Sequence, residues 1–158
     1  MYRSMKNLFL YKLVLYSIST FLVVQVSIPK LCAQRSEDAI RVSNMGYMQY
    51  ANAVDCDSIE GVSLYERICL NIEFQKVDSI LTRRMNTYIL MSDDLTERRQ
   101  KRNYHNIWLE NRRFHSNSIA RSFNGHYKGI YYLELMIIST KKRIEELEMI
   151  FGIFEVQY

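Results

Sequence analysis

The stretch CDSIEGVSLYERICLNIEFQKVDSILTRRMNTY, residues 56–88, decides the fold of this chain. Ser63 and Glu66 have the spacing of a capping box, which predicts a short helix from Ser63 to about Cys69. Asn71 suits the N-cap of a second helix. This second helix carries apolar residues at steps of three and four, which predict one buried stripe: Phe74, Val77, Leu81, Met85 and Tyr88.

Two cysteines bracket the short predicted helix. So short a helix is unstable alone in water because nucleation is costly, and a bond between Cys56 and Cys69 would hold it in place. Closing a loop of this size contributes roughly 3 kcal/mol in the chain-entropy description of disulfides. The alternative is a pair of buried free thiols, which gains weight if the chain stays in a reducing compartment.

Residues 1–33 have the pattern of a secretory signal peptide. Three basic residues precede an apolar run over residues 13–28, and Ala33 offers a cleavage site before Gln34. Cleavage would remove Cys32 and leave Cys56 and Cys69 as an even pair in an oxidising compartment. The alternatives are a retained membrane anchor and lipidation at Cys32. The apolar run is short and interrupted for a span of about 20 residues, so we expect no stable transmembrane span after cleavage.

The net charge of +4 comes from the predicted leader. Four of the 21 basic residues and none of the 17 acidic residues lie in residues 1–33, so the remaining chain has 17 of each. This balance argues against nucleic acid as a partner. Charge is nevertheless uneven, because residues 95–128 hold eight basic residues and only two acids.

Residues 34–53 are polar and without a persistent period, and they are predicted to form a loose arm. The alternative is that this arm packs on the domain or forms a short helix through Met45, Tyr47, Met48 and Tyr50. Asp93 and Asp94 suit the start of a helix that runs to about residue 118. Its inward face is predicted to consist of the apolar residues Leu95, Tyr104, Ile107, Trp108, Phe114 and Ile119.

Gly125 lies in a predicted turn over residues 122–129. The last helix is predicted from about Ile130 to Phe151, with an unbroken seam: Ile130, Leu133, Ile137, Thr140, Ile144, Leu147 and Phe151. Gly152 suits the end of this helix, and residues 153–158 form a C-terminal tail. The predicted fold is all-α: a small antiparallel bundle over residues 54–152, with one short disulfide-pinned helix and three longer helices.

The sequence holds no arrangement typical of catalysis. His105, His115 and His126 are spread over a helix and a turn, and none lies near a cysteine in sequence, so a zinc site lacks ligands. Asp93 and Asp94 are explained by a helix N-terminus more simply than by acid–base chemistry. We therefore expect no enzyme, no cofactor and no metal.

The basic helix predicted after Asp94 is the other sequence feature that bears on function. Basic residues surround Tyr104 and Trp108 there: Arg98, Arg99, Lys101, Arg102, Arg112 and Arg113. Interleaved basic and aromatic residues can bind nucleic acid or an anionic membrane. The favoured interpretation is a solvated face above a core Trp108, packed against Phe74, Leu81 or Ile137.

The chain resembles the LprI-type lysozyme inhibitor N-terminal domain family, small exported helical proteins that mostly lack an assigned function. The matching residues are Cys56 and Cys69 with Glu66 and Arg67 before the second cysteine, then Asp78, Leu81, Tyr88, Trp108, Arg112, Gly125, Thr140, Arg143 and Leu147. The resemblance covers residues 54–148 and suggests that Arg112 bridges an acid such as Asp78. Many members have a second cysteine pair; here Ser116 and residues 133–135 occupy those places.

The resemblance implies an exported, non-enzymatic binding protein, with a lysozyme or another envelope macromolecule as its partner. Lysozyme is strongly basic, so an inhibitor needs an acidic face such as Asp55, Asp57 and Glu60, or a loop that enters the cleft. The alternatives are a structural helical protein of the envelope, and a binder of anionic wall or membrane polymers through Arg98 and Arg102.

Overall fold

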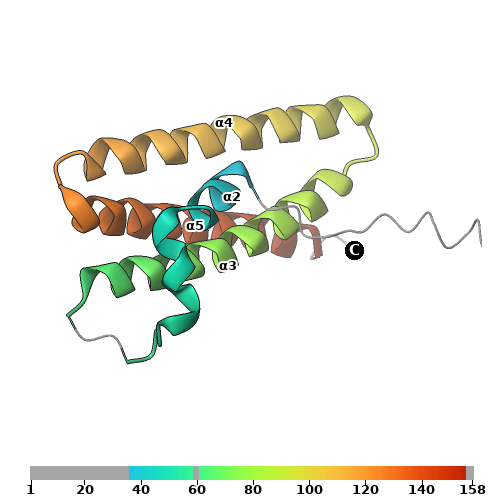
Figure 1. Cartoon of the computed structure of the whole chain (residues 1–158). Coiled ribbons are helices and arrows are strands. Elements are labelled where there is room, and N and C mark those ends of the chain that lie inside the picture. Colours follow the sequence, from blue (N-terminus) through green and yellow to red (C-terminus); the bar gives the residue numbers. More distant parts are fainter. Residues whose placement is uncertain (1–35, 59–60, 156–158) are drawn as a thin grey trace, which may run out of the picture. The chain divides into compact units, whose positions relative to one another are not determined.

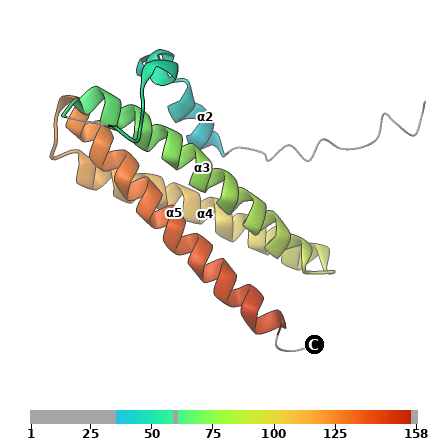
Figure 2. The same cartoon turned by 90° about the horizontal axis from the view of Figure 1, so that it is seen from below.

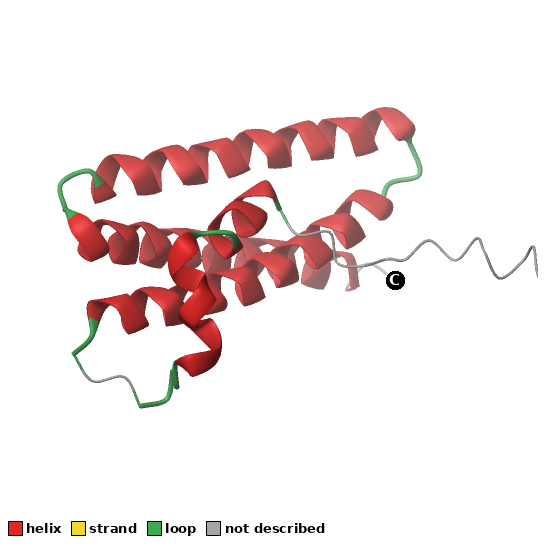
Figure 3. Ribbon diagram, viewed as in Figure 1, coloured by secondary structure: helices red, strands yellow, loops and turns green. Residues whose placement is uncertain are grey.

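The structure, a computed structural model, describes residues 36–58 and 61–155. Its elements are α2 (Glu37–Ser43), the 3₁₀ helix η2 (Gly46–Ala53), α3 (Ser63–Leu90), α4 (Leu95–Ala120) and α5 (Gly125–Glu155), as Figure 1 shows. The described residues contain helices and loops but no strand (Figure 3), which confirms the all-α prediction. The predicted leader over residues 1–33 lies outside the described residues, as do Ile59, Glu60 and residues 156–158.

Each of the long helices α3, α4 and α5 runs antiparallel to the one before it in the chain. Helix α5 packs along both α3 and α4 (Figure 2). The direct contact between α3 and α4 is smaller than the contact of α5 with either helix. The short helix α2 contacts α3 and lies near the seam between α3 and α4 (Figure 1). The arrangement is therefore a three-helix bundle with a short fourth helix.

A single helix replaces the two helices predicted around Cys69. Helix α3 runs without interruption for 28 residues, its N-cap is Val62, and no side chain caps it, so the prediction of a capping box at Ser63 and Glu66 is wrong. Asn71, predicted as an N-cap, is fully buried and donates to the backbone oxygen of Val42 and to the Tyr47 hydroxyl, both at 2.8 Å. Asn71 thus satisfies a buried polar contact inside a helix rather than beginning one.

The predicted disulfide joins Cys56 to Cys69, with Cα atoms 5.6 Å apart. It connects the loop after η2 to the second turn of α3. The staple therefore fixes a loop against a long helix, whereas the sequence predicted that it would hold a short helix in place.

Two apolar clusters form the core. The first joins α2, α3, the last residue of α4 and α5, and it includes Phe74, Leu133 and Met136, which are almost fully buried. The second joins α3 and α5 through Leu81, Met85, Ile89 and Leu147, and Trp108 of α4 packs against it half-buried. Phe74, Val77, Leu81 and Met85 of the predicted stripe are buried, and Tyr88 is half-buried. On α5, Ile130, Leu133, Ile137, Thr140 and Leu147 of the predicted seam are buried, and Ile144 and Phe151 are half-buried.

The ends of α4 and α5 follow the sequence in part. Asp94 caps α4, because its carboxylate accepts from the backbone N–H groups of Thr96 at 2.9 Å and Glu97 at 3.3 Å. Gly125 has φ of +59°, a conformation that favours glycine, and helix α5 begins there, earlier than predicted. Gly152 does not end α5, which continues to Glu155, because Gly152 lacks the left-handed conformation of a terminating glycine.

The predicted loose arm is helical and packed. Ser36 caps α2 by accepting from the backbone N–H of Ala39 at 3.2 Å. Asp38, Ala39 and Val42 are all buried against the bundle. The alternative of a packed short helix therefore describes residues 37–53 better than a free arm, although Met45 and Tyr50 stay exposed.

Helix α4 buries a different face from the one that the sequence predicts. Its buried residues are Arg112, Ser116 and Ala120, at steps of four. The predicted inward residues Leu95, Tyr104, Ile107, Phe114 and Ile119 are exposed, and Trp108 alone of that set is partly buried. The prediction is wrong because the inward face of α4 is held by polar contacts, which hydrophobic periodicity does not detect.

Candidate functional site

Arg112 is the centre of a buried charge network. Its side chain is fully buried, and its guanidinium donates to Asp78 Oδ1 of α3 at 3.0 Å and to Asp38 Oδ2 of α2 at 3.2 Å. It also donates to the Thr140 hydroxyl of α5 at 2.8 Å. One side chain thus ties α4 to α2, α3 and α5. The Arg112–Asp78 bridge agrees with the expectation from the family resemblance.

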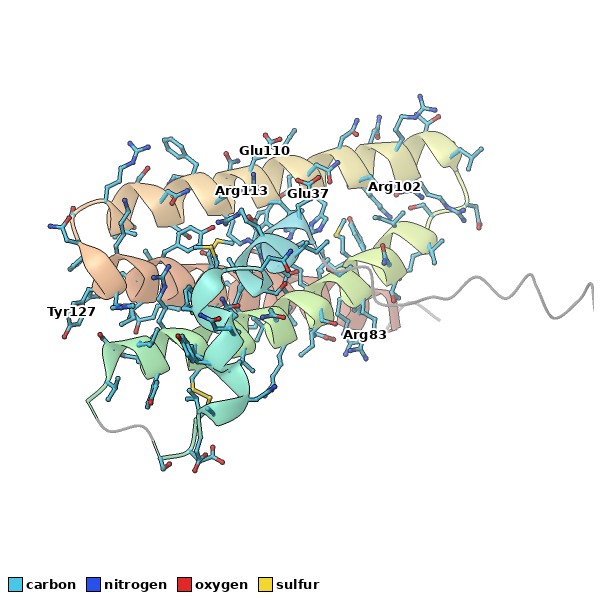
Figure 4. The ribbon with its side chains drawn as sticks, in the orientation of Figure 1. Glu37, Arg83, Arg102, Glu110, Arg113 and Tyr127 are labelled. Carbon is cyan, nitrogen blue, oxygen red and sulfur yellow. A yellow bond between two sulfur atoms is a disulfide. The ribbon has the colours of Figure 1, made fainter. Side chains whose placement is uncertain are left out.

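Asp38 is the second node of this network. Its Oδ1 accepts from Arg113 Nε at 2.8 Å and from Arg41 at 3.2 Å, in addition to the Arg112 contact through Oδ2. Arg113 lies between α4 and α2 in Figure 4. Arg41 also donates to the hydroxyl of Tyr132 on α5. Burial raises the pKa of Tyr132, and the positive charge of Arg41 offsets part of that shift. The carboxylate of a seven-residue helix therefore organises three arginines.

Aromatic rings enclose the arginines. The Arg112 guanidinium lies 5.2 Å from the ring centres of both Phe74 and Trp108. Arg143 of α5 lies 4.9 Å from the ring centre of Tyr104 and 5.8 Å from that of Trp108. Such contacts contribute about 0.5–2 kcal/mol each. They place the aromatic residues of α4 in a structural role beside the buried charges.

His105 lies in the same region and stacks on Trp108 with ring centres 6.1 Å apart. Its Nδ1 is buried and has no hydrogen-bond partner among the described residues. Burial, followed by the positive charges of Arg143 and Arg112, lowers the pKa of His105 from 6.5 to about 4. The imidazole is therefore neutral at pH 7, and protonation would place a third positive charge beside two arginines.

Arg67, one of the family-matching residues, packs across α5 at Gly129. A Cβ at residue 129 would collide with the Arg67 guanidinium, so the glycine makes room for it. The guanidinium also lies 4.2 Å from the ring centre of Tyr47 in η2. This contact fixes η2 against the start of α3 and α5.

The residues that match the family are mostly interior residues. Asp78, Leu81, Arg112, Thr140, Arg143 and Leu147 are all buried, and Tyr88 and Trp108 are half-buried. Asp78, Arg112 and Thr140 bond to one another through Arg112, while Arg143 donates to Glu146 at 2.7 Å. Gly125 is exposed at the first residue of α5. This set holds the fold together and offers no open surface to a partner.

The acidic candidates occupy the disulfide-bounded loop before α3. Asp55 and Asp57 are exposed on either side of Cys56. Asp55 accepts from the Ser58 hydroxyl at 2.8 Å and from the Asp57 backbone N–H at 3.1 Å. These hydrogen bonds, with the Ser58 contribution first, lower the pKa of the Asp55 carboxyl, so it stays ionised at neutral pH. Glu60, the third predicted acid, lies outside the described residues.

The basic candidates are dispersed by the fold. Arg98 donates to the backbone oxygen of Ser92, and Lys101 bonds to Ser92, Tyr88 and Glu97 at the start of α4. Arg112 is interior, and Arg113 pairs with Asp38. Of the six basic residues of α4, only Arg99 and Arg102 are exposed, and neither forms an ion pair within the described residues. The basic residues of α4 therefore do not form one continuous exposed surface.

Asp38 is the residue that sequence reasoning missed. The available signal was the pattern Ser36-Glu37-Asp38-Ala39, a good N-cap followed by acids in a first helical turn. Asp38 was predicted to lie in a polar arm because a helix of seven residues is too short to show the periodicity of a buried face.

No group of three His, Cys, Asp or Glu side chains within residues 36–58 and 61–155 is placed to hold a metal ion. In the same part of the chain, each helix is too short or too polar to cross a membrane. Comparisons with protein families, curated proteins and solved structures find no match to this chain.

Proposed function

We propose that this chain is an exported, non-enzymatic binding protein that contacts a cationic macromolecule through its disulfide-bounded acidic loop. The observation that carries the proposal is the loop itself. A covalent bond at Cys56 and the hydrogen bonds of Asp55 hold two exposed carboxylates in the loop before α3. A turn held in place, as residues 55–58 are by these bonds, loses less conformational entropy on binding than a free segment.

Export is supported by the disulfide and by the leader pattern of residues 1–33. Disulfides form and persist mainly in oxidising compartments such as the periplasm or the extracellular space. The absence of catalytic turnover is supported by the ion pairs that the buried charged residues form with one another. Asp38, Asp78 and Arg112 are engaged with one another, so they act as structural ions and have no open position for a substrate.

The most specific form of the proposal is inhibition of a lysozyme. It rests on the family resemblance and on charge, because lysozymes are strongly basic and an acidic loop favours association with a basic surface. The mature chain is neutral as a whole, so attraction has to come from a local group of acids such as Asp55 and Asp57.

The test measures the rate at which several lysozymes clear a suspension of peptidoglycan, with and without the exported, oxidised protein. We expect near-stoichiometric inhibition of at least one lysozyme. Asp55→Asn with Asp57→Asn should weaken it by about tenfold or more, because Asn keeps the hydrogen bonds of the loop and removes its charge. Asp93→Asn with Glu145→Gln is the matched control, since it removes two exposed acids elsewhere.

Three outcomes separate the alternatives. Folded, oxidised protein that inhibits no lysozyme would remove the inhibitor proposal and leave a structural protein of the envelope. Equal loss in the loop variant and in its control would remove the loop as the binding face. Salt-sensitive binding to anionic lipid or wall polymer that depends on Arg99 and Arg102 would favour the basic face of α4 instead.

A further inference from the structure

The outer face of α4 exposes large apolar side chains along the middle of the helix. Tyr104 and Ile107 are each 57% exposed, and Phe114 is 63% exposed. Figure 4 shows Glu110, which lies between Ile107 and Phe114 in the sequence, on the outer side of α4, away from α2 and α5. Grouped exposure of this kind marks interaction surfaces in soluble proteins.

The spacing of these residues is that of a coiled-coil seam. Tyr104, Ile107, Asn111, Phe114 and Ser118 follow one another at steps of three, four, three and four, and all are exposed. In heptad terms, Tyr104, Asn111 and Ser118 occupy the a positions, and Ile107 and Phe114 occupy the d positions. We refer to these five residues as the outer seam. The inward face of α4 holds Arg112, Ser116 and Ala120. Of the outer seam, Tyr104 borders that face, because its ring lies 4.9 Å from the Arg143 guanidinium of α5 while the residue stays 57% exposed.

The polar members of the outer seam indicate what covers it. An anionic membrane would have to bury Asn111 and its neighbour Glu110 in acyl chains without hydrogen-bond partners, which is costly. A second α4 in the same register presents Asn111 to Asn111, where each amide can donate and accept. A single asparagine at an a position is an established device that fixes the register of a helix pair.

The parallel arrangement is also the better of the two possible directions. With parallel helices in register, each apolar layer of Tyr104, Ile107 or Phe114 meets its own counterpart. In an antiparallel pair, a positions face d positions, so the amide of Asn111 would face Ile107 or Phe114 of the other copy and lose its partner. Parallel pairing further places Glu110 at a g position opposite His115 at an e position of the second copy, so a carboxylate meets a ring N–H donor.

We propose that two copies of this chain associate through the outer seam of α4, parallel and in register about a two-fold axis. The interface is isologous, so the same five residues serve both copies. It leaves the acidic loop before α3 free, and it therefore does not depend on the proposed function of that loop.

The experiment measures the mass of the protein, purified in the form that an exporting host produces, by sedimentation equilibrium over a wide concentration range. We expect a reversible dimer. Ile107→Gln and Phe114→Gln should each raise the dissociation constant by about tenfold or more, because apolar anchors at the centre of an interface carry most of the affinity. Ile138→Gln on α5 is the matched control, since Ile138 is 50% exposed but lies off the outer seam.

A second variant tests the direction of pairing without any loss of apolar area. Ser118→Cys should form a disulfide between the two copies under mild oxidation, because parallel helices bring the two Ser118 positions together. Antiparallel helices would hold them several turns apart, and no cross-link would form.

The proposal is overturned by a protein that remains monomeric at the highest concentration tested. It is also overturned by a dimer that keeps its affinity in both Gln variants while circular dichroism shows them folded. Binding of monomers to anionic vesicles through Ile107 and Phe114 would likewise replace the second copy by a membrane as the occupant of this face.

Discussion

Two of the interfaces in this bundle are built from opposite chemistry. Helix α5 meets α3 through apolar side chains such as Leu133, Leu147 and Leu81, which are nearly inaccessible to solvent. Helix α4 meets α2 and α3 through Arg112, whose charge is shared between Asp38 and Asp78. Burial of apolar surface stabilises the first interface directly. The second interface is stable only while each buried charge keeps its counter-charge, because an unpaired buried charge is costly.

The largest expected effect comes from breaking the polar interface. Arg112→Ala should lower the free energy of unfolding by about 3–5 kcal/mol, because it leaves the buried Asp78 without its counter-charge and removes one of the three arginines around Asp38. Urea denaturation measures this loss. Arg113→Ala is the matched control: Arg113 also pairs with Asp38, but its side chain is 38% exposed, so about 1 kcal/mol or less is expected.

A combined variant sharpens the same prediction. Arg112→Met with Asp38→Asn and Asp78→Asn removes the buried charges together, and it should recover much of the stability that Arg112→Ala loses. If Arg112→Ala costs no more than Arg113→Ala, the view of this interface as a mutually dependent set of charges is wrong.

The apolar interface should respond to a cavity. Leu133→Ala should cost about 2–5 kcal/mol, because Leu133 is almost fully buried in the cluster that joins α3 and α5. Ile138→Ala on the exposed side of α5 should cost less than 1 kcal/mol. Chemical denaturation of both variants at pH 5 and pH 7 should give the same cost at each pH, since no titratable group takes part.

The pH dependence of the free energy of unfolding should also distinguish the two interfaces. The folded-state pKa of His105 is about 4, below the ordinary value of 6.5, so neutral His105 contributes stability that is present above pH 6.5. This contribution is lost as the pH falls from 6.5 through 4, and it amounts to about 3 kcal/mol. His105→Gln should flatten the pH dependence of unfolding in this window. Asn106→Gln, which changes an exposed, non-titrating residue beside His105, should leave it unchanged.

The smallest effect concerns the packing of Arg67 on α5. Gly129→Ala should lower the free energy of unfolding by about 1 kcal/mol, because the displaced guanidinium loses its contact with Tyr47 and offsets the better helix propensity of alanine. In the background of Arg67→Ala, the same Gly129→Ala change should become stabilising. A double-mutant cycle measures this coupling, and additive effects would contradict it.

The contrast between the interfaces also explains what the sequence could predict. The stripe on α3 and the seam on α5 were found because apolar residues repeat at three and four. Helix α4 was located correctly but turned the wrong way, since its inward residues Arg112 and Ser116 give no hydrophobic signal. The Arg112–Asp78 bridge was anticipated by the family resemblance, while Asp38 was hidden in a segment too short to show a period.

The candidate loop was predictable in composition but not in shape. The sequence placed Asp55 and Asp57 beside Cys56, and the structure adds the hydrogen bonds that hold Asp55 in a turn. The disulfide was predicted from cysteine counting, but its role was misjudged because α3 was expected to break at Cys69. A helix boundary depends on tertiary contacts such as those of Asn71, which local sequence does not reveal.

The pairing of Asp38 with Arg112 has a consequence for the order of events during folding. The two residues are separated by 74 positions, and Asp38 is synthesised first. Helix α2 cannot stand alone at seven residues, so it depends on the helices that it packs against, of which α5 is synthesised last. Contacts between distant residues form slowly because a long loop must close first. The charge balance of the interior is therefore completed late, and the segment nearest the predicted leader is among the last parts of the bundle to settle.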